Sequence, residues 1–293
     1  MRRRFGYFYT LPVSIWITVF FVIPTAIVLL FSFMQKGLRG GVVCQFSLDA
    51  YRALFQPAFL GVVGRTVYIS LAVTVLTLAV AIPASYYIAR SRYKNTLLLL
   101  IIVPFWTNLL IRIFAWISIL GNNGFLNAFL VSTGLITDHI QFLYTNYAVI
   151  IVTVYTSLPY AILPLYSTIE KFDFSLLEAA RDLGATKAQS MRKVFLPGIR
   201  SGVITAVIFT FIPALGSYAI PQLVGGTNSY MIGNIIAREL TTNRNWPLAS
   251  SMSMILTIVT TVGILIFLKL NSQSPKAVKV EDEIPSQGGS DGR

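Results

Sequence analysis

The residues that could carry chemistry gather in one charged segment from Ser175 to Pro197, which reads SLLEAARDLGATKAQSMRKVFLP and holds six charged side chains. The whole chain has one histidine, His139, and one cysteine, Cys44, so it can form neither a histidine metal cluster nor an internal disulfide. It contains no G-x-x-x-x-G-K-[ST] motif, so no P-loop cradles ATP. We therefore expect no catalytic residue, no metal and no cofactor in this chain, and we interpret the segment as a surface for a protein contact.

The pattern of this segment predicts two short helices with a sharp turn between them. Ser175, with a glutamate three residues later, matches a capping box and predicts that the first helix begins there. Gly184 suits the left-handed position just after that helix. Thr186, with a glutamine three residues later, repeats the capping pattern. Pro197 should end the second helix, because its ring removes a donor and clashes with the preceding turn.

The segment lies between two apolar runs and cannot itself enter a membrane, since each charge at the bilayer centre costs roughly 2.5–3.5 kcal/mol. The 293-residue chain is 55% hydrophobic and 12% charged, with a mean hydropathy of +0.70. A soluble domain has about 25% charged residues. These values indicate an all-α, polytopic membrane protein.

Six apolar runs each reach the ~20 residues that a helix needs to cross the bilayer. The six predicted spans are residues 10–33, 66–89, 97–120, 147–168, 199–220 and 248–270. No internal repeat is visible, so we expect one transmembrane domain over residues 1–271, with a polar loop at 170–198. Residues 272–293 are rich in Ser, Gln, Gly, Pro and acid and are predicted to be a disordered cytoplasmic tail.

Charge placement predicts the orientation. The N-terminus, the 90–96 turn, the 170–198 loop with Arg200 beside it, and the C-terminal segment together hold 16 Lys and Arg, whereas the alternate connections hold 6. The positive-inside rule assigns the first group, and with it both termini, to the cytoplasm. The net charge of +12 is therefore that of a membrane protein, and we expect no nucleic-acid partner.

The charged segment resembles the EAA loop of ABC importer permeases. That family shows EAA, three residues, G, nine residues and I-x-L-P; here Val194 stands at the Ile position. The resemblance implies the type I ABC importer permease fold with six transmembrane helices, and a coupling-helix loop that docks on ATPase subunits, which bind the ATP. The implied coupling residues are Glu178, Ala179, Ala180, Gly184, Leu196 and Pro197.

A second resemblance covers most of residues 66–270. The stretch Pro104–Arg112 is similar to the PFWTN-x-LIR stretch of permeases of bacterial spermidine/putrescine importers, as are Leu163–Ala185, Gly225-Gly226 and Ile232–Asn234. The resemblance implies polyamine transport in a bacterial inner membrane. It also implies a second permease subunit on a different chain and an extracytoplasmic substrate-binding protein as partners, besides membrane lipid.

Several aromatic and polar side chains in the spans are candidates for the transport pathway. Asn108 and Arg112 are four residues apart, so we expect them on one helix face toward protein or water; Arg112 reaching the outer surface is the alternative. Aromatic faces attract ammonium groups, although such residues also pack between helices or at the membrane interface. The candidate pathway residues are Trp106, Asn108, Arg112, Tyr155, Tyr160 and Tyr218.

Other functions are possible on the same residues. The cargo of an ABC permease could instead be an amino acid, ferric ion or oxyanion. An ion-coupled secondary transporter predicts intramembrane acids or an inverted repeat, and neither is visible. A membrane enzyme needs an acid–base or metal constellation, which one His and acid-free spans do not supply.

Overall fold

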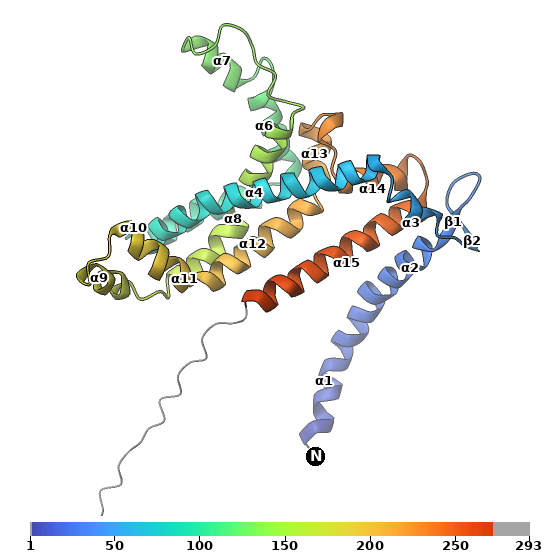
Figure 1. Cartoon of the computed structure of the whole chain (residues 1–293), viewed down its shortest axis with the longest axis horizontal. Helices are drawn as coiled ribbons and strands as arrows, with labels where there is room; N and C mark the ends of the chain where they lie inside the picture. The colour runs from blue at the N-terminus through green and yellow to red at the C-terminus, as the bar shows by residue number, and fades with distance from the viewer. Residues whose placement is uncertain (1, 272–293) are drawn as a thin grey trace, which may run out of the picture.

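The protein is seen in a computed structural model that describes residues 2–271, with side chains from Thr10 to Lys269. The predicted disordered tail, 272–293, lies outside the described residues. Within them the chain is mostly helical, and three long helices pack together as the centre of the molecule (Figure 1). These are α4 (Pro57–Arg90), α8 (Asn146–Ile169) and α12 (Arg200–Leu215).

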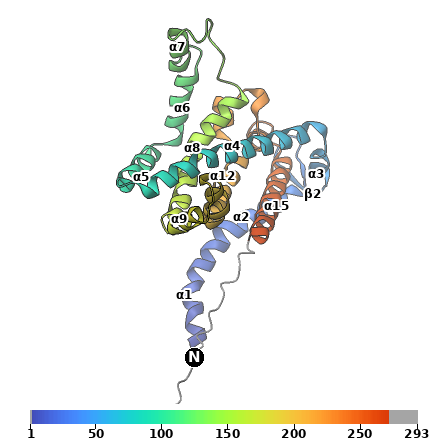
Figure 2. The same cartoon turned by 60° about the vertical axis from the view of Figure 1, so that its left-hand side comes forward.

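A peripheral pair of helices lies beside this centre. α15 (Trp246–Asn271) packs against α2 (Ile23–Ser32). α2 continues a helix formed by α1 (Arg2–Ile17) and the π-helical turn η1 (Thr18–Val22). Both views show α1 pointing away from the bundle (Figures 1 and 2), and none of the most apolar part of Thr10–Ser32 is buried within this chain.

The number of apolar helices agrees with the membrane prediction. Among residues 2–271, five helical stretches are long and apolar enough to cross a bilayer, and a sixth appears if the bent pair Lys187–Gly198 and Arg200–Leu215 counts as one span. The two halves of that pair meet at an angle of 71°. The five are Thr10–Ser32, Pro57–Arg90, Leu109–Ser132, Asn146–Ile169 and Trp246–Lys269.

The third predicted span, 97–120, is wrong as a single helix. α5 (Lys94–Ile102) runs into the 3₁₀ turn η2 (Val103–Trp106), and the helix then breaks at residues 107–108. Pro104 removes one helical N–H, and the Asn108 side chain accepts a hydrogen bond from the N–H of Leu110 at 2.8 Å. A new helix, α6 (Leu109–Leu120), begins there and is followed by α7 (Phe125–Ser132).

The fifth predicted span, 199–220, is shorter than expected. α12 ends at Leu215, and after a break the short helix α13 (Ala219–Val224) follows. The outer connections also contain structure: α14 (Ile232–Thr241), the 3₁₀ turn η4 (Thr227–Ser229), α3 (Asp49–Ala53), and the antiparallel pair β1 (Met34–Lys36) and β2 (Val42–Phe46). This hairpin is a small addition to an otherwise helical fold.

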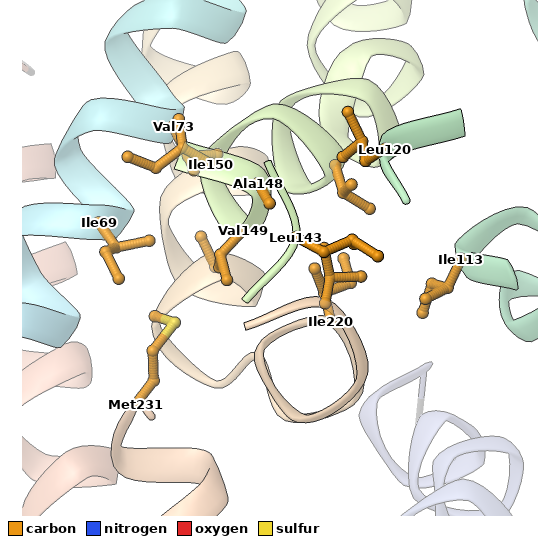
Figure 3. Close-up of a cluster of buried hydrophobic side chains, with 13 residues drawn as sticks. Ile69, Val73, Ile113, Leu120, Leu143, Ala148, Val149, Ile150, Ile220 and Met231 are labelled. Carbon is orange, nitrogen blue, oxygen red and sulfur yellow. The ribbon is translucent and has the colours of Figure 1, made fainter. Parts of the chain in front are cut away.

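The central core joins α4 and α8 to α6, α13 and the Met231 segment. Figure 3 shows Ile69 and Val73 of α4 facing Val149 and Ile150 of α8, with Met231 below them. On the same helix α4, buried Ser and Thr residues share the interface with these apolar side chains. Small residues of this kind let helix backbones approach closely without a cavity. The buried hydroxyl residues of α4 are Thr66, Ser70, Thr74, Thr77 and Ser85.

The two ends of the bundle carry different structures. The short helices of the 170–198 loop lie together at one end, beyond Arg90 of α4 (Figure 1). At the other end lie α3, α13, α14 and the hairpin. The 170–198 loop and the predicted outer connections 34–65 and 221–247 therefore lie at opposite ends of the bundle, while α7 projects away from it (Figure 1).

Candidate functional site

The 170–198 loop folds as the predicted pair of short helices. α9 spans Ser175–Asp182, and the second helix consists of α10 (Lys187–Ser190), the π-helical turn η3 (Met191–Phe195) and α11 (Leu196–Gly198). Gly184 has φ +86°, in the left-handed region as expected. Its N–H bonds the Arg181 carbonyl at 2.8 Å, and the N–H of Ala185 bonds the Ala180 carbonyl at 3.0 Å. This is a Schellman motif, which ends α9 and makes the turn.

The two helix starts differ from each other. The capping box of the second helix is confirmed: the Thr186 hydroxyl accepts from the N–H of Gln189 at 3.2 Å, and the Gln189 side chain accepts from the N–H of Thr186 at 2.9 Å. The capping box predicted at Ser175 is wrong. The Asp173 carboxylate accepts from the N–H of Ser175 at 3.0 Å instead, and hydrogen bonds from the Ser175 side chain and backbone hold the pKa of Asp173 below its usual value.

Pro197 does not end the second helix. It lies in the first turn of α11, where its missing N–H costs little, and it follows the widened π turn of η3. The helix runs on to Gly198, and the N–H of Ile199 still reaches the Phe195 carbonyl at 3.0 Å. The bend into α12 therefore falls at Ile199, two residues after the proline.

Four aromatic side chains, which we call the aromatic anchor, attach the loop to the bundle. Phe195 is fully buried, and its ring meets Tyr86 of α4 at 5.2 Å and Phe172 at 5.4 Å, both edge to face. Phe174 packs on Tyr86 at 5.8 Å and on Phe172 at 5.5 Å. The Arg90 guanidinium covers Phe174 at 5.3 Å and donates to the Tyr86 hydroxyl at 2.8 Å. Side chains therefore attach the loop to α4, in addition to its chain connections to α8 and α12.

An ion pair adds a second attachment at the end of α8. Lys94 Nζ lies 2.7 Å from Glu170 Oε1, which also accepts from the Tyr166 hydroxyl at 2.7 Å. The hydrogen bond from Lys94 has the largest effect in lowering the pKa of Glu170, and the hydrogen bond from Tyr166 lowers it further. The pair connects the end of α8 to the start of α5, which precedes the break at residues 107–108 in the chain.

The predicted coupling residues face outward from these attachments. Leu177 is buried on the bundle side, whereas Leu183 between the two helices is 89% exposed. Ala180, whose carbonyl closes the Schellman motif, is half-buried. The other predicted coupling residues are exposed: Glu178, Ala179, Gly184, Leu196 and Pro197. Among the described residues the Glu178 carboxylate has no hydrogen-bond or ion-pair partner, so it is available to another protein.

Three of the predicted pathway residues come together at the break in the third span. The Arg112 guanidinium lies over the Phe105 ring, 4.5 Å from its centre. That ring also contacts Tyr155 at 6.1 Å and Tyr160 at 6.5 Å, and Trp116 packs on Tyr155 at 5.5 Å. We call these five side chains the Arg112 cluster. Phe105 and Trp116 were missed from sequence, although Phe105 lies inside the PFWTN stretch and Trp116 is four residues after Arg112.

The remaining pathway candidates lie elsewhere. Trp106 is 82% exposed, and Tyr218 is half-exposed between α12 and α13. Asn108 caps α6, so the prediction that it shares a helix face with Arg112 is wrong: Asn108 lies before the helix. No ring contact or side-chain hydrogen bond joins these three to the Arg112 cluster among the described residues. The guanidinium of Arg112 faces protein, since its Nε and Nη1 atoms are buried.

Comparisons with known proteins give this geometry a context. Residues 81–276 match the family described as "Binding-protein-dependent transport system inner membrane component". The chain is 36% identical over 268 residues to the spermidine/putrescine transport system permease protein PotB of Haemophilus influenzae, covering 91% of this chain and 94% of that protein. It is equally similar to PotB of Escherichia coli, over 91% and 98% of the two chains.

The fold also matches a solved structure. The crystal structure of a bacterial alginate ABC transporter in complex with an alginate pentasaccharide-bound periplasmic protein contains a chain that superposes with a TM-score of 0.71. The match covers 92% of this chain and 94% of that chain at 19% identity. At this identity the likeness concerns the fold.

Proposed function

Since the chain belongs to the family of binding-protein-dependent transport system inner membrane components, we propose that it is the permease subunit of an ATP-driven polyamine importer. Spermidine or putrescine is the proposed cargo, supported by the 36% identity to PotB proteins over nine-tenths of the chain. The observation that carries the permease assignment is the 170–198 loop, which exposes Glu178 and Ala179 of its EAA motif on a base attached to the long helices.

The loop is proposed to receive the force of ATP hydrolysis from partner ATPase subunits. Its exposed face offers the Glu178 carboxylate and the bare Leu183 side chain, which suit a groove with a basic group and an apolar floor. Its other side is held by the aromatic anchor on α4. Closure of an ATPase dimer would therefore push on the long helices of the bundle, because Phe174 and Phe195 of the loop pack on Tyr86 of α4.

The remaining partners complete the proposed assembly. A second permease on a different chain would cover the apolar surfaces that this chain leaves exposed, such as Thr10–Ser32. A substrate-binding protein outside the cell would deliver the cargo at the end that carries α13 and α14. The 170–198 loop and both termini would lie in the cytoplasm of the bacterium, with the chain in the inner membrane.

Two other transport functions remain candidates on the same fold. An amino acid, ferric ion or oxyanion could replace the polyamine, since the same fold occurs in a transporter for alginate, a very different cargo. An ion-coupled secondary transporter would need no ATPase. Copurification separates these classes, because an importer permease should bring down an ATPase and a secondary transporter should not.

The decisive experiment is reconstitution of the whole complex in liposomes. ATP hydrolysis should rise when a binding protein loaded with spermidine or putrescine is added. Binding proteins loaded with an amino acid or an oxyanion serve as controls and should leave the rate unchanged. Stimulation by one of these, with none by the polyamine-loaded protein, would refute the polyamine assignment.

A further inference from the structure

The Arg112 cluster contains a positive charge, and two nitrogen atoms of its guanidinium group have no hydrogen-bond acceptor among the described residues. Arg112 Nε and Nη1 are buried and have no hydrogen-bond partner among the described residues. A buried donor without an acceptor is costly, and a buried charge is more so. The guanidinium is stabilised mainly by the face of Phe105, 4.5 Å away. A better partner for the rings or for the arginine should therefore displace the guanidinium from Phe105.

The cluster has the groups that an organic ammonium needs. Phe105 presents one ring face, its ring contacts Tyr155 at 6.1 Å and Tyr160 at 6.5 Å, and Trp116 packs on Tyr155 at 5.5 Å. An ammonium also needs acceptors for its N–H groups. α8 supplies two, because Pro159 and Pro164 lie four residues after Tyr155 and Tyr160. A proline has no N–H, so the carbonyls of both tyrosines lose their usual helical donors.

Arg112 and an ammonium cargo cannot share these rings. Two positive charges a few ångströms apart repel each other strongly where water is scarce. The arginine is also tied to the break in the third span, since its N–H bonds the Asn108 carbonyl at 3.3 Å and Asn108 caps α6. The guanidinium that covers Phe105 therefore belongs to a residue of the first turn of α6.

We propose that the face of Phe105, flanked by the rings of Tyr155 and Tyr160, is a cation site for one ammonium group of the cargo, and that Arg112 covers this face as a tethered competitor until the cargo displaces it. This inference rests on the proposed polyamine function. In the empty permease the guanidinium fills the site and prevents tight binding of free cation. Delivered cargo displaces the Arg112 guanidinium from the Phe105 face.

The test measures direct binding of spermidine to the full complex without its binding protein. Arg112→Gln removes the competing charge and should tighten spermidine binding about 2- to 30-fold, the range of a desolvated cation–π contact. Arg112→Met, similar in length and uncharged, should do the same if glutamine disturbs assembly. Arg112→Lys keeps a tethered cation and should bind as the wild type does. Adding Phe105→Leu to Arg112→Gln should abolish the gain.

Two outcomes would overturn the proposal. Neutral variants that bind spermidine no more tightly than the wild type would show that Arg112 does not compete. A second permease that dissociates from both neutral variants but not from Arg112→Lys would show that the arginine serves the subunit contact instead. ATP hydrolysis by the wild-type complex with spermidine-loaded binding protein is measured in parallel. If the neutral variants bind spermidine no more tightly but this hydrolysis is stimulated, only the inference about Arg112 fails. If the hydrolysis is not stimulated, the proposed polyamine function fails.

Discussion

At the scale of single residues, Gly184 is the position where backbone geometry alone is at stake. It has φ +86°, and a side chain placed there would meet nothing within 4 Å. A substitution therefore acts on the turn, since a left-handed backbone costs roughly 1–2 kcal/mol for most residues and more for a β-branched one. Gly184→Val should weaken ATPase binding or uncouple hydrolysis from uptake, while membrane insertion stays intact.

The matched control at this position is Gly184→Asn, because asparagine tolerates the left-handed region. It should retain most of the uptake that Gly184→Val loses. The measurement is substrate uptake together with copurified ATPase for both variants. Normal uptake and ATPase binding in Gly184→Val would show that the turn does not couple the subunits.

Glu178 separates capping from contact. The capping-box pattern predicted that its carboxylate caps α9, but Asp173 provides that cap and Glu178 has no partner among the described residues. Glu178→Gln should therefore leave the thermal unfolding midpoint of the permease unchanged and reduce the amount of ATPase that copurifies. Asp173→Ala is the reverse control, because it removes the oxygen that accepts from the N–H of Ser175, and it should loosen the loop itself. An unaltered yield of ATPase with Glu178→Gln would mean that the negative charge is dispensable.

At the scale of elements, the Lys94–Glu170 pair joins the ends of α5 and α8. The pKa of Glu170 is lowered in the folded protein, so the pair stabilises the fold above the unfolded carboxyl pKa of about 4.3, and this contribution disappears as the pH falls through the folded value. Glu170→Gln should lower the thermal unfolding midpoint modestly at pH 7, because both side chains are part-exposed and screened by solvent.

The pH dependence distinguishes this pair from a general packing effect. The difference between wild type and Glu170→Gln should shrink as the pH is lowered into the acid range, where the wild-type carboxylate also becomes neutral. Glu178→Gln is the matched control, since that carboxylate has no partner among the described residues. A difference in midpoint that persists unchanged at low pH would assign the effect of Glu170 to its packing rather than its charge.

At the scale of the whole molecule, the opposite ends of the bundle carry loops that should lie on opposite sides of the membrane. Asp138 and Lys187 are both exposed, so a cysteine at either is equally open to a reagent. The native Cys44 is also exposed and must first be replaced by serine. An impermeant thiol reagent added outside intact cells should label Asp138→Cys and not Lys187→Cys. The reverse labelling would invert the topology.

The unchanged chain, which keeps Cys44, serves as a positive control for labelling from outside. Cys44 lies in β2, at the same end of the bundle as α13 and α14 (Figure 1). It should therefore be labelled from outside in the otherwise unchanged chain. Lysis of the cells should make Lys187→Cys reactive, which confirms that this position is accessible once the membrane is open.

Features that depend on local chemistry could be predicted from the amino-acid sequence. Length and hydropathy of the apolar runs predicted a helical membrane protein, because an unsatisfied backbone in lipid is too costly for other structures. Gly184 and the Thr186 capping box were predicted correctly because each acts within one turn of chain. The EAA residues identified the loop because their types and fixed spacing lie within one short, continuous segment.

Contacts between residues far apart in the sequence could not be predicted and are seen in the folded chain. In the aromatic anchor, Tyr86 of α4 contacts Phe174 and Phe195, which follow α8 in the chain, and Phe195 also contacts Phe172. No local sequence pattern predicts these contacts. The break at residues 107–108 falls inside an apolar run that was predicted to be one helix. The cap from Asp173 takes the place of the capping box predicted at Ser175. The Arg112 guanidinium lies on Phe105 of η2, across the break that precedes α6. Contacts of this kind depend on how the helices pack, and packing is a property of the whole fold.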